Sequence, residues 1–360
     1  MEALASLGDG TPSFCVVFAS AHYYRHAETV LKAVTDVTGD VPSIGCVGEA
    51  VIGSGQEAEG EPAVSVLVAA EAGPVESYEM DFVRTATGGA FGGYLFEPGP
   101  HLMIADPYSF PVDILLEHLN QNVPGTVVAG GMASAGSPRQ RSRLFRDGKV
   151  RSEGAVGMRL AGAEVHPLVS QGCRAVGEPF TVTSAEGNIV YQLGGASPWR
   201  RLRELADGLS RRDQQLLSDG VQLGIVIDEY RAEQGPGDFL IRSVLGGEPE
   251  SGALAIGDDV EVGQTVQFHI RDADSADEDL RRILRQEVAA LGGDRPAGAV
   301  LFSCNSRGTR LFGRPDHDAE LVSDALGDIP VAGFFCGGEL GPVGGRNFLH
   351  TFTASIAVFS

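Results

Sequence analysis

Side chains with thiol, amide and guanidinium groups are concentrated just after an apolar run near the C-terminus. The run at 299–302 is followed within eight residues by Cys304, Asn305, Arg307 and Arg310. Loops converge at the carboxyl ends of strands in α/β sheets, so ligands gather there. Arginine can hold a carboxylate through two parallel hydrogen bonds. We therefore expect Arg307 to anchor an anionic ligand group and Asn305 to orient it, the alternative being surface salt bridges to the many acidic residues.

A second cluster combines aromatic, glycine and carboxylate residues. It contains two phenylalanines at 334–335, Cys336, Gly337 and Glu339, with Asn347 further along the chain. Aromatic rings beside bare backbone and a carboxylate can line a pocket for an amino or ring compound. Glu339 would then bind a cationic group and Asn347 would orient the ligand. The alternative is that the phenylalanines are core residues and the glycines only turn the chain.

Two residues near the N-terminus occupy positions that correspond to these clusters. Glu49 follows Gly48 as Glu339 follows Gly338. Ser20 ends an apolar run, as Cys304 does. Glu49 and Ser20 are therefore additional candidates for ligand contacts.

The elements that must position these residues recur along the chain. Three copies share an apolar strand, an amphipathic helix, a (Val/Ile)-Pro pair, a glycine-rich strand and a closing strand, and they begin at residues 14, 101 and 299. Such units predict an α/β fold with mixed sheets built from repeated strand-helix-strand segments. A hairpin pattern at 180–192 and a polar stretch at 210–213 interrupt the series. We expect two domains, at 1–210 and 211–360.

Composition excludes several classes of partner and cofactor. The 360 residues include 27 Lys and Arg against 48 Asp and Glu, a formal charge of −21. Nucleic acid and anionic membrane surfaces need clustered positive charge, so neither is an expected partner. No apolar stretch approaches the roughly 20 residues that span a bilayer. Phosphate-loop and dinucleotide fingerprints are absent, and five widely spaced cysteines predict no disulfide framework or zinc site.

The start of the chain predicts its compartment. Residues 1–4 carry neither a basic region nor the beginning of a long apolar segment. This pattern predicts no signal peptide. Together with the cysteine usage, it predicts a reduced, cytoplasmic protein.

Several motifs resemble the FIST domain family. FSCNSRG, PVAGFFCGGELGP and GDFLIR resemble the FIST C-terminal domain, and PSIGC, QGC and GEPF resemble the N-terminal domain; they lie at 302–308, 330–342, 237–242, 42–46, 171–173 and 177–180. The resemblance covers nearly the whole chain. It implies an intracellular sensory module for small molecules such as amino acids, which would signal through a separate protein partner. One branch of the family resembles haem-based gas sensors that use a histidine ligand.

Two alternatives remain beside a non-enzymatic ligand sensor without a cofactor. A haem sensor would use His317 or His350, bound non-covalently because no CxxCH site exists. A cysteine-dependent enzyme would use Cys304 or Cys336 as nucleophile, with one of these histidines as base. For the leading hypothesis, we expect Arg307, Cys336 and Glu339 to line a water-accessible hollow.

Overall fold

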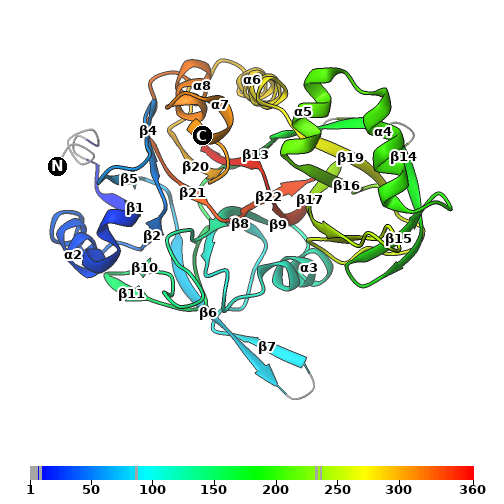
Figure 1. Ribbon diagram of the computed structural model, residues 1–360. Coiled ribbons are helices and arrows are strands. Elements are labelled where there is room, and N and C mark those ends of the chain that lie inside the picture. Colours follow the sequence, from blue (N-terminus) through cyan, green and yellow to red (C-terminus); the bar gives the residue numbers. More distant parts are fainter. Residues whose placement is uncertain (1–6, 8–9, 86–87, 232–233, 236) are drawn as a thin grey trace. The chain divides into compact units, whose positions relative to one another are not determined.

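The computed structural model describes residues 7, 10–85, 88–231, 234–235 and 237–360 (Figure 1). Residues 1–4, on which the signal-peptide prediction depends, lie outside this part. The chain forms two compact units, one of Met1–Val169 with Leu280–Ser360 and one of Ser170–Asp279. It passes between them within strand β13 (Val165–Gln171) and helix α6 (Ala273–Ala290). The consecutive domains expected at 1–210 and 211–360 stay a prediction.

The larger unit contains the three predicted repeats. In each, a first strand pairs in parallel with a second and antiparallel with a third. The first repeat consists of β1 (Pro12–Ser20), η1 (Ala21–His26), α2 (Ala27–Thr38), β2 (Ser43–Gly48) and β5 (Val64–Ala70). The second consists of β8 (Gly99–Ala105), α3 (Val112–Asn122), β9 (Thr126–Met132) and β12 (Ala155–Leu160). The third consists of β20 (Gly298–Cys304), α7 (Thr309–Phe312), α8 (His317–Leu326), β21 (Val331–Cys336) and β24 (Thr353–Phe359). The predicted α/β fold of repeated units is confirmed.

Further strands extend each repeat into a sheet. The five-stranded sheet has the order β11-β10-β2-β1-β5, with β10 (Leu144–Arg146) and β11 (Lys149–Arg151). The seven-stranded sheet has the order β23-β22-β9-β8-β12-β6-β7, with β6 (Val75–Thr85), β7 (Gly88–Gly92), β22 (Glu339–Val343) and β23 (Arg346–His350). The six-stranded sheet has the order β13-β24-β20-β21-β3-β4, with β3 (Val51–Gly53) and β4 (Gln56–Ala58). Strand β22, which lies between β21 and β24 in the third repeat, pairs with β9 of the second repeat. This long-range pairing joins the two repeats.

The apolar runs are continuous because both faces of the central strands are buried. Alternate residues of all three sheets enter one shared core, among them Phe18, Ile104 and Phe302. The residues between them pack against helices, as Val17 does with α2 and Leu301 with α8 and α6. Residues that come directly after these strands and point to the same side as the core residues therefore lie at the end of the shared core.

The glycines of the second strands have a steric cause. A Cβ added at Gly45, Gly130 or Gly333 would lie 1.7, 1.8 or 2.0 Å from a carbonyl oxygen of the parallel neighbour. Real Cβ atoms do not approach backbone so closely, and only glycine fits where two strands come this near. This accounts for one glycine in each copy of the repeat.

The smaller unit is a closed barrel with strand order β14-β15-β18-β17-β16-β19. Its elements are β14 (Cys173–Glu186), β15 (Ile189–Leu193), α4 (Pro198–Gly208), α5 (Arg211–Asp219), β16 (Val221–Val226), β17 (Phe239–Gly247), β18 (Leu254–Ile256) and β19 (Thr265–Arg271). Its interior is apolar, with Val182 and Phe268 fully buried. The polar stretch at 210–213 is the start of α5, where the Ser210 hydroxyl accepts the Asp213 N–H.

In the part of the chain that the structure describes, every helix is too short or too polar to cross a bilayer.

Candidate functional site

Strands β20 and β21 end side by side, and their last residues begin the candidate site. Cys304 and Cys336 are register partners across this parallel pair. The Asn305 N–H donates to the Cys336 carbonyl at 2.9 Å, which fixes the first residue after β20. Glu339 follows two glycines later as the first residue of β22. The two sequence clusters therefore meet at one end of the shared core.

Arg307 is fully buried and paired with a carboxylate. Its Nε and Nη2 donate to the two carboxylate oxygens of Asp318 at 2.7 and 2.9 Å, and neither side chain has exposed area. Asp318 also accepts from the Ser303 hydroxyl and contacts the His317 ring. Burial alone would raise the pKa of Asp318, but the Arg307 guanidinium and its hydrogen bonds hold it well below the usual range. The pair is therefore a two-bond salt bridge buried inside the protein.

Glu339 is the second buried carboxyl group of the site. Its Oε2 accepts from the Thr353 N–H and hydroxyl at 3.2 and 2.9 Å. Burial raises its pKa to about 8, although Thr353 and the charge of Arg307 act against this. Within the described chain, Glu339 Oε1 and Arg307 Nη1 are buried without a hydrogen-bond partner. An incompletely satisfied polar layer thus lies under the end of β20.

Three of the predicted residues form a partly exposed group beside this layer. Arg310 pairs with the Glu49 carboxylate, with the two side chains 58% and 39% exposed. Asn305 Nδ2 donates to Glu49 at 3.3 Å, and Arg310 donates to the Asn305 carbonyl at 2.7 Å. The Glu49 N–H is held by Ser134. We call Glu49, Asn305 and Arg310 the charged rim.

The expectation that Arg307, Cys336 and Glu339 line a water-accessible hollow is wrong, because all three are sealed from solvent. Cys336 and Glu339 have no exposed area, and Arg307 has none either. Asp318, from α8, pairs with the Arg307 guanidinium, which was expected to bind an anionic group of the ligand. The sequence held one signal for this, because Asp318 is in a short acidic run at a helix start, but only tertiary packing brings it to Arg307.

The remaining predicted residues have partners elsewhere in the fold. The Ser20 hydroxyl accepts the Ala63 N–H at 3.1 Å, which ties β1 to the segment before β5. Asn347 bonds to the backbone of Thr126 and Val128, so it joins β23 to β9, although β22 lies between these two strands in the sheet order. The Gly337 N–H donates to the Met132 carbonyl at 2.9 Å. These residues hold neighbouring segments of the sheets together.

The two histidines suggested as haem ligands are engaged within the fold. The His317 ring stacks on Phe312 at 3.3 Å between centroids, and His350 Nε2 bonds to the Gly341 carbonyl at 3.0 Å. Both are buried. Both rings therefore have a place in the packing of the fold, and the haem alternative stays a prediction.

The cysteines lack the features of an activated nucleophile. Burial raises the pKa of the Cys304 thiol to about 12 and that of Cys336 well above its ordinary value, and Glu339 adds to both shifts. A thiolate needs an electropositive setting that lowers the pKa.

Among the described residues, no group of three or more His, Cys, Asp or Glu is arranged to hold a metal ion.

Comparison with known proteins gives two family matches and close relatives. The FIST N domain matches residues 13–196 and the FIST C domain matches residues 201–342. The Mycobacterium tuberculosis protein "Uncharacterized protein Rv0628c" is 48% identical over 99% of this chain and 94% of its own length. The Mycobacterium bovis protein "Uncharacterized protein Mb0898c" is 46% identical over 99% of this chain and 93% of its own length.

Proposed function

The chain belongs to the FIST family, and from that premise we propose that it is a small-ligand sensory module without catalytic activity. FIST domains are regarded as sensory modules for small ligands. We further propose that its ligand is an amino acid or a related metabolite with both an amino and an acidic group. The module would pass its signal to a separate protein.

The charged rim is the observation that carries this proposal. It presents a guanidinium and a carboxylate side by side, and the Asn305 side-chain amide donates to the carboxylate. A free amino acid carries the same two charges in the same proximity, so its carboxylate can take the place of Glu49 on Arg310 and its ammonium the place of Arg310 on Glu49. An exposed ion pair contributes only about 0–1 kcal/mol, so exchanging it for ligand contacts costs little.

The buried layer supports a sensing role for the same place. Asn305 belongs to the rim through its side chain and to the end of β21 through its backbone. A ligand that moves Asn305 therefore acts on strands whose ends also carry Cys336 and Glu339. Arg307 and Glu339 each have a buried polar atom without a hydrogen-bond partner. A change in the conformation of these side chains would therefore break few hydrogen bonds.

A thermal-shift panel tests the proposal. The twenty common amino acids are compared with derivatives that lack one charge, the N-acetylated acids and the amino amides. We expect at least one amino acid to raise the melting temperature, and its two derivatives to have no effect. Binding should be lost in Arg310→Ala and in Glu49→Gln.

The control variant is Arg346→Ala, because Arg346 forms an ion pair with Glu117 at similar exposure, 50% and 51%. It should bind as the unaltered protein does. The proposal is contradicted if no amino acid shifts the melting temperature, or if Arg310→Ala responds to the same ligand by the same amount.

A further inference from the structure

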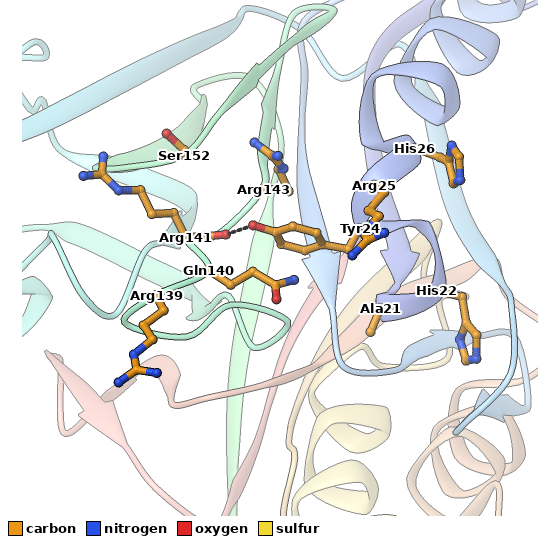
Figure 2. A pocket seen from close by; sticks show the side chains of 10 residues that line it. All are labelled: Ala21, His22, Tyr24, Arg25, His26, Arg139, Gln140, Arg141, Arg143 and Ser152. Carbon is orange, nitrogen blue, oxygen red and sulfur yellow. Dashed lines mark hydrogen bonds between the residues drawn. The ribbon is translucent and has the colours of Figure 1, made fainter.

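A hollow of about 800 Å³ lies apart from the residues of the charged rim, and its lining is cationic. Figure 2 shows its two walls, η1 after β1 and the segment between β9 and β10, with Ser152 after β11 beside the latter. Arg25 comes from η1, and Arg139, Arg141 and Arg143 come from the second wall. His22 and His26 also line it, and none of its lining residues is acidic. We call it the arginine hollow.

The arginine hollow contrasts with the charge of the whole chain. Asp and Glu outnumber Lys and Arg by 48 to 27, so most arginines can find a carboxylate. Arg141 does so with Glu153. Within the described residues, Arg25, Arg139 and Arg143 have no carboxylate at ion-pair distance. Unpaired like charges gathered in one concavity repel each other, and an anion bound between them removes that repulsion.

The walls are held in place by bonds that leave the guanidinium groups unused. The Tyr24 hydroxyl donates to the Arg141 carbonyl, which links the two walls. The Val47 N–H donates to the Arg143 carbonyl at 2.9 Å, and the buried Ser142 hydroxyl donates to Asp106. A site whose backbone is already fixed binds its ligand with less loss of conformational entropy.

Arg143 is the most constrained of the cationic groups. Its guanidinium lies over the Tyr24 ring, 5.0 Å from the centroid. Its Nε is buried and has no hydrogen-bond partner in the described structure. The stacking on Tyr24 fixes the Arg143 guanidinium at the wall of the hollow, so little further ordering of the side chain is needed when an anion binds.

We propose that the arginine hollow is a second ligand site and that it binds a small molecule with two or more oxyanion groups, a phosphate ester or a polycarboxylate. Arginine pairs with phosphate and carboxylate oxygens through two parallel hydrogen bonds. The guanidinium groups stand on both walls in Figure 2, so a single acidic group reaches only part of them. The volume lies within the range of about 300–1,000 Å³ that is usual for metabolite sites. This proposal does not depend on amino-acid binding at the charged rim.

Isothermal titration calorimetry with inorganic pyrophosphate and with citrate tests this inference, and acetate serves as the monovalent comparison. We expect pyrophosphate, citrate or both to bind, and acetate to bind far more weakly. Arg139→Ala and Arg143→Ala should each weaken binding by about tenfold or more, the effect of losing a hydrogen bond to a charged group. Arg346→Ala, outside the hollow, should leave the affinity unchanged. Arg139→Ala keeps the test valid if removing Arg143 from Tyr24 disturbs folding.

The outcomes separate the ligand sources and the two proposals. Binding of pyrophosphate alone identifies a phosphate ligand, and binding of citrate alone a polycarboxylate. No binding of either, equal binding of acetate, or unchanged affinity in Arg139→Ala overturns the inference. Amino-acid binding at the charged rim should persist in Arg139→Ala, so failure here does not imply failure there.

Discussion

The substitution Asp318→Asn tests whether the site rests on a buried ion pair. The variant keeps the shape of the side chain but removes its charge, so Arg307 is left ionised with no opposite charge paired to it and no exposed area. The contacts at stake are two guanidinium hydrogen bonds of 2.7 and 2.9 Å and the Ser303 hydroxyl bond of 2.8 Å. Breaking a buried pair by removing one partner costs about 3–5 kcal/mol. We expect the free energy of unfolding to fall by that amount.

Urea unfolding followed by far-UV circular dichroism measures this change. The only tryptophan, Trp199, lies in the barrel unit, so its fluorescence does not report on the unit that holds Asp318. Hydrogen–deuterium exchange of peptides from 298–326 locates the effect. The matched control is Asp36→Asn, since the Lys32–Asp36 pair is 72% and 60% exposed and should contribute less than about 1 kcal/mol.

Two results would refute the reasoning. One is a loss for Asp318→Asn no larger than that for Asp36→Asn. The other is increased exchange only in peptides of the barrel unit. The double variant Arg307→Met with Asp318→Leu checks the cause, because removing both charges should recover much of the stability lost by removing one.

Three further predictions concern protonation, backbone contact and thiol chemistry. Burial raises the pKa of Glu339 from 4.5 to about 8, so the folded protein retains a proton that the unfolded chain loses, and stability should fall as pH rises across that window. Burial also raises the pKa of Glu57 to about 8, so Glu339→Gln should reduce this slope in urea titrations without abolishing it, and an unchanged slope would assign it to Glu57 or other groups. Gly130→Ala would place a Cβ 1.8 Å from a carbonyl oxygen and should cost about 1–3 kcal/mol or more in thermal melts, whereas Gly53→Ala, which meets open space, should cost little; equal costs would contradict the close approach. Cys304 and Cys336 should react with iodoacetamide at neutral pH far more slowly in the folded protein than in urea, and fast reaction of either would revive the enzyme hypothesis.

The repeated units could be predicted from sequence because their signal is local. Strands that are buried on both faces appear in the sequence as continuous apolar runs. Each second strand contains glycine because the backbone of the neighbouring strand leaves no room for a Cβ atom. Closure of the barrel could not be predicted, since β14 pairs with β19 about ninety residues away. The placement of β22 beside β9, in a sheet begun by another repeat, is equally non-local.

The location of the candidate site could be predicted from the sequence, but the burial and pairing of its side chains could not. Strand ends identified Cys304, Asn305 and Glu339, which the fold brings together. Burial and pairing depend on α8 and β24, whose positions relative to β20 are set by packing, so the acidic run around Asp318 did not reveal that its partner is Arg307. The arginine hollow did leave one in the sequence, because arginines at 139, 141 and 143 alternate in an otherwise acidic chain.

Native mass spectrometry in the presence of the amino acid that gives the largest thermal shift tests the sensory role most directly. The account predicts one bound ligand per chain, retained in Arg346→Ala and absent from Arg310→Ala. A spectrum with only the mass of the free protein, or the same occupancy in all three proteins, would contradict ligand binding at Glu49 and Arg310.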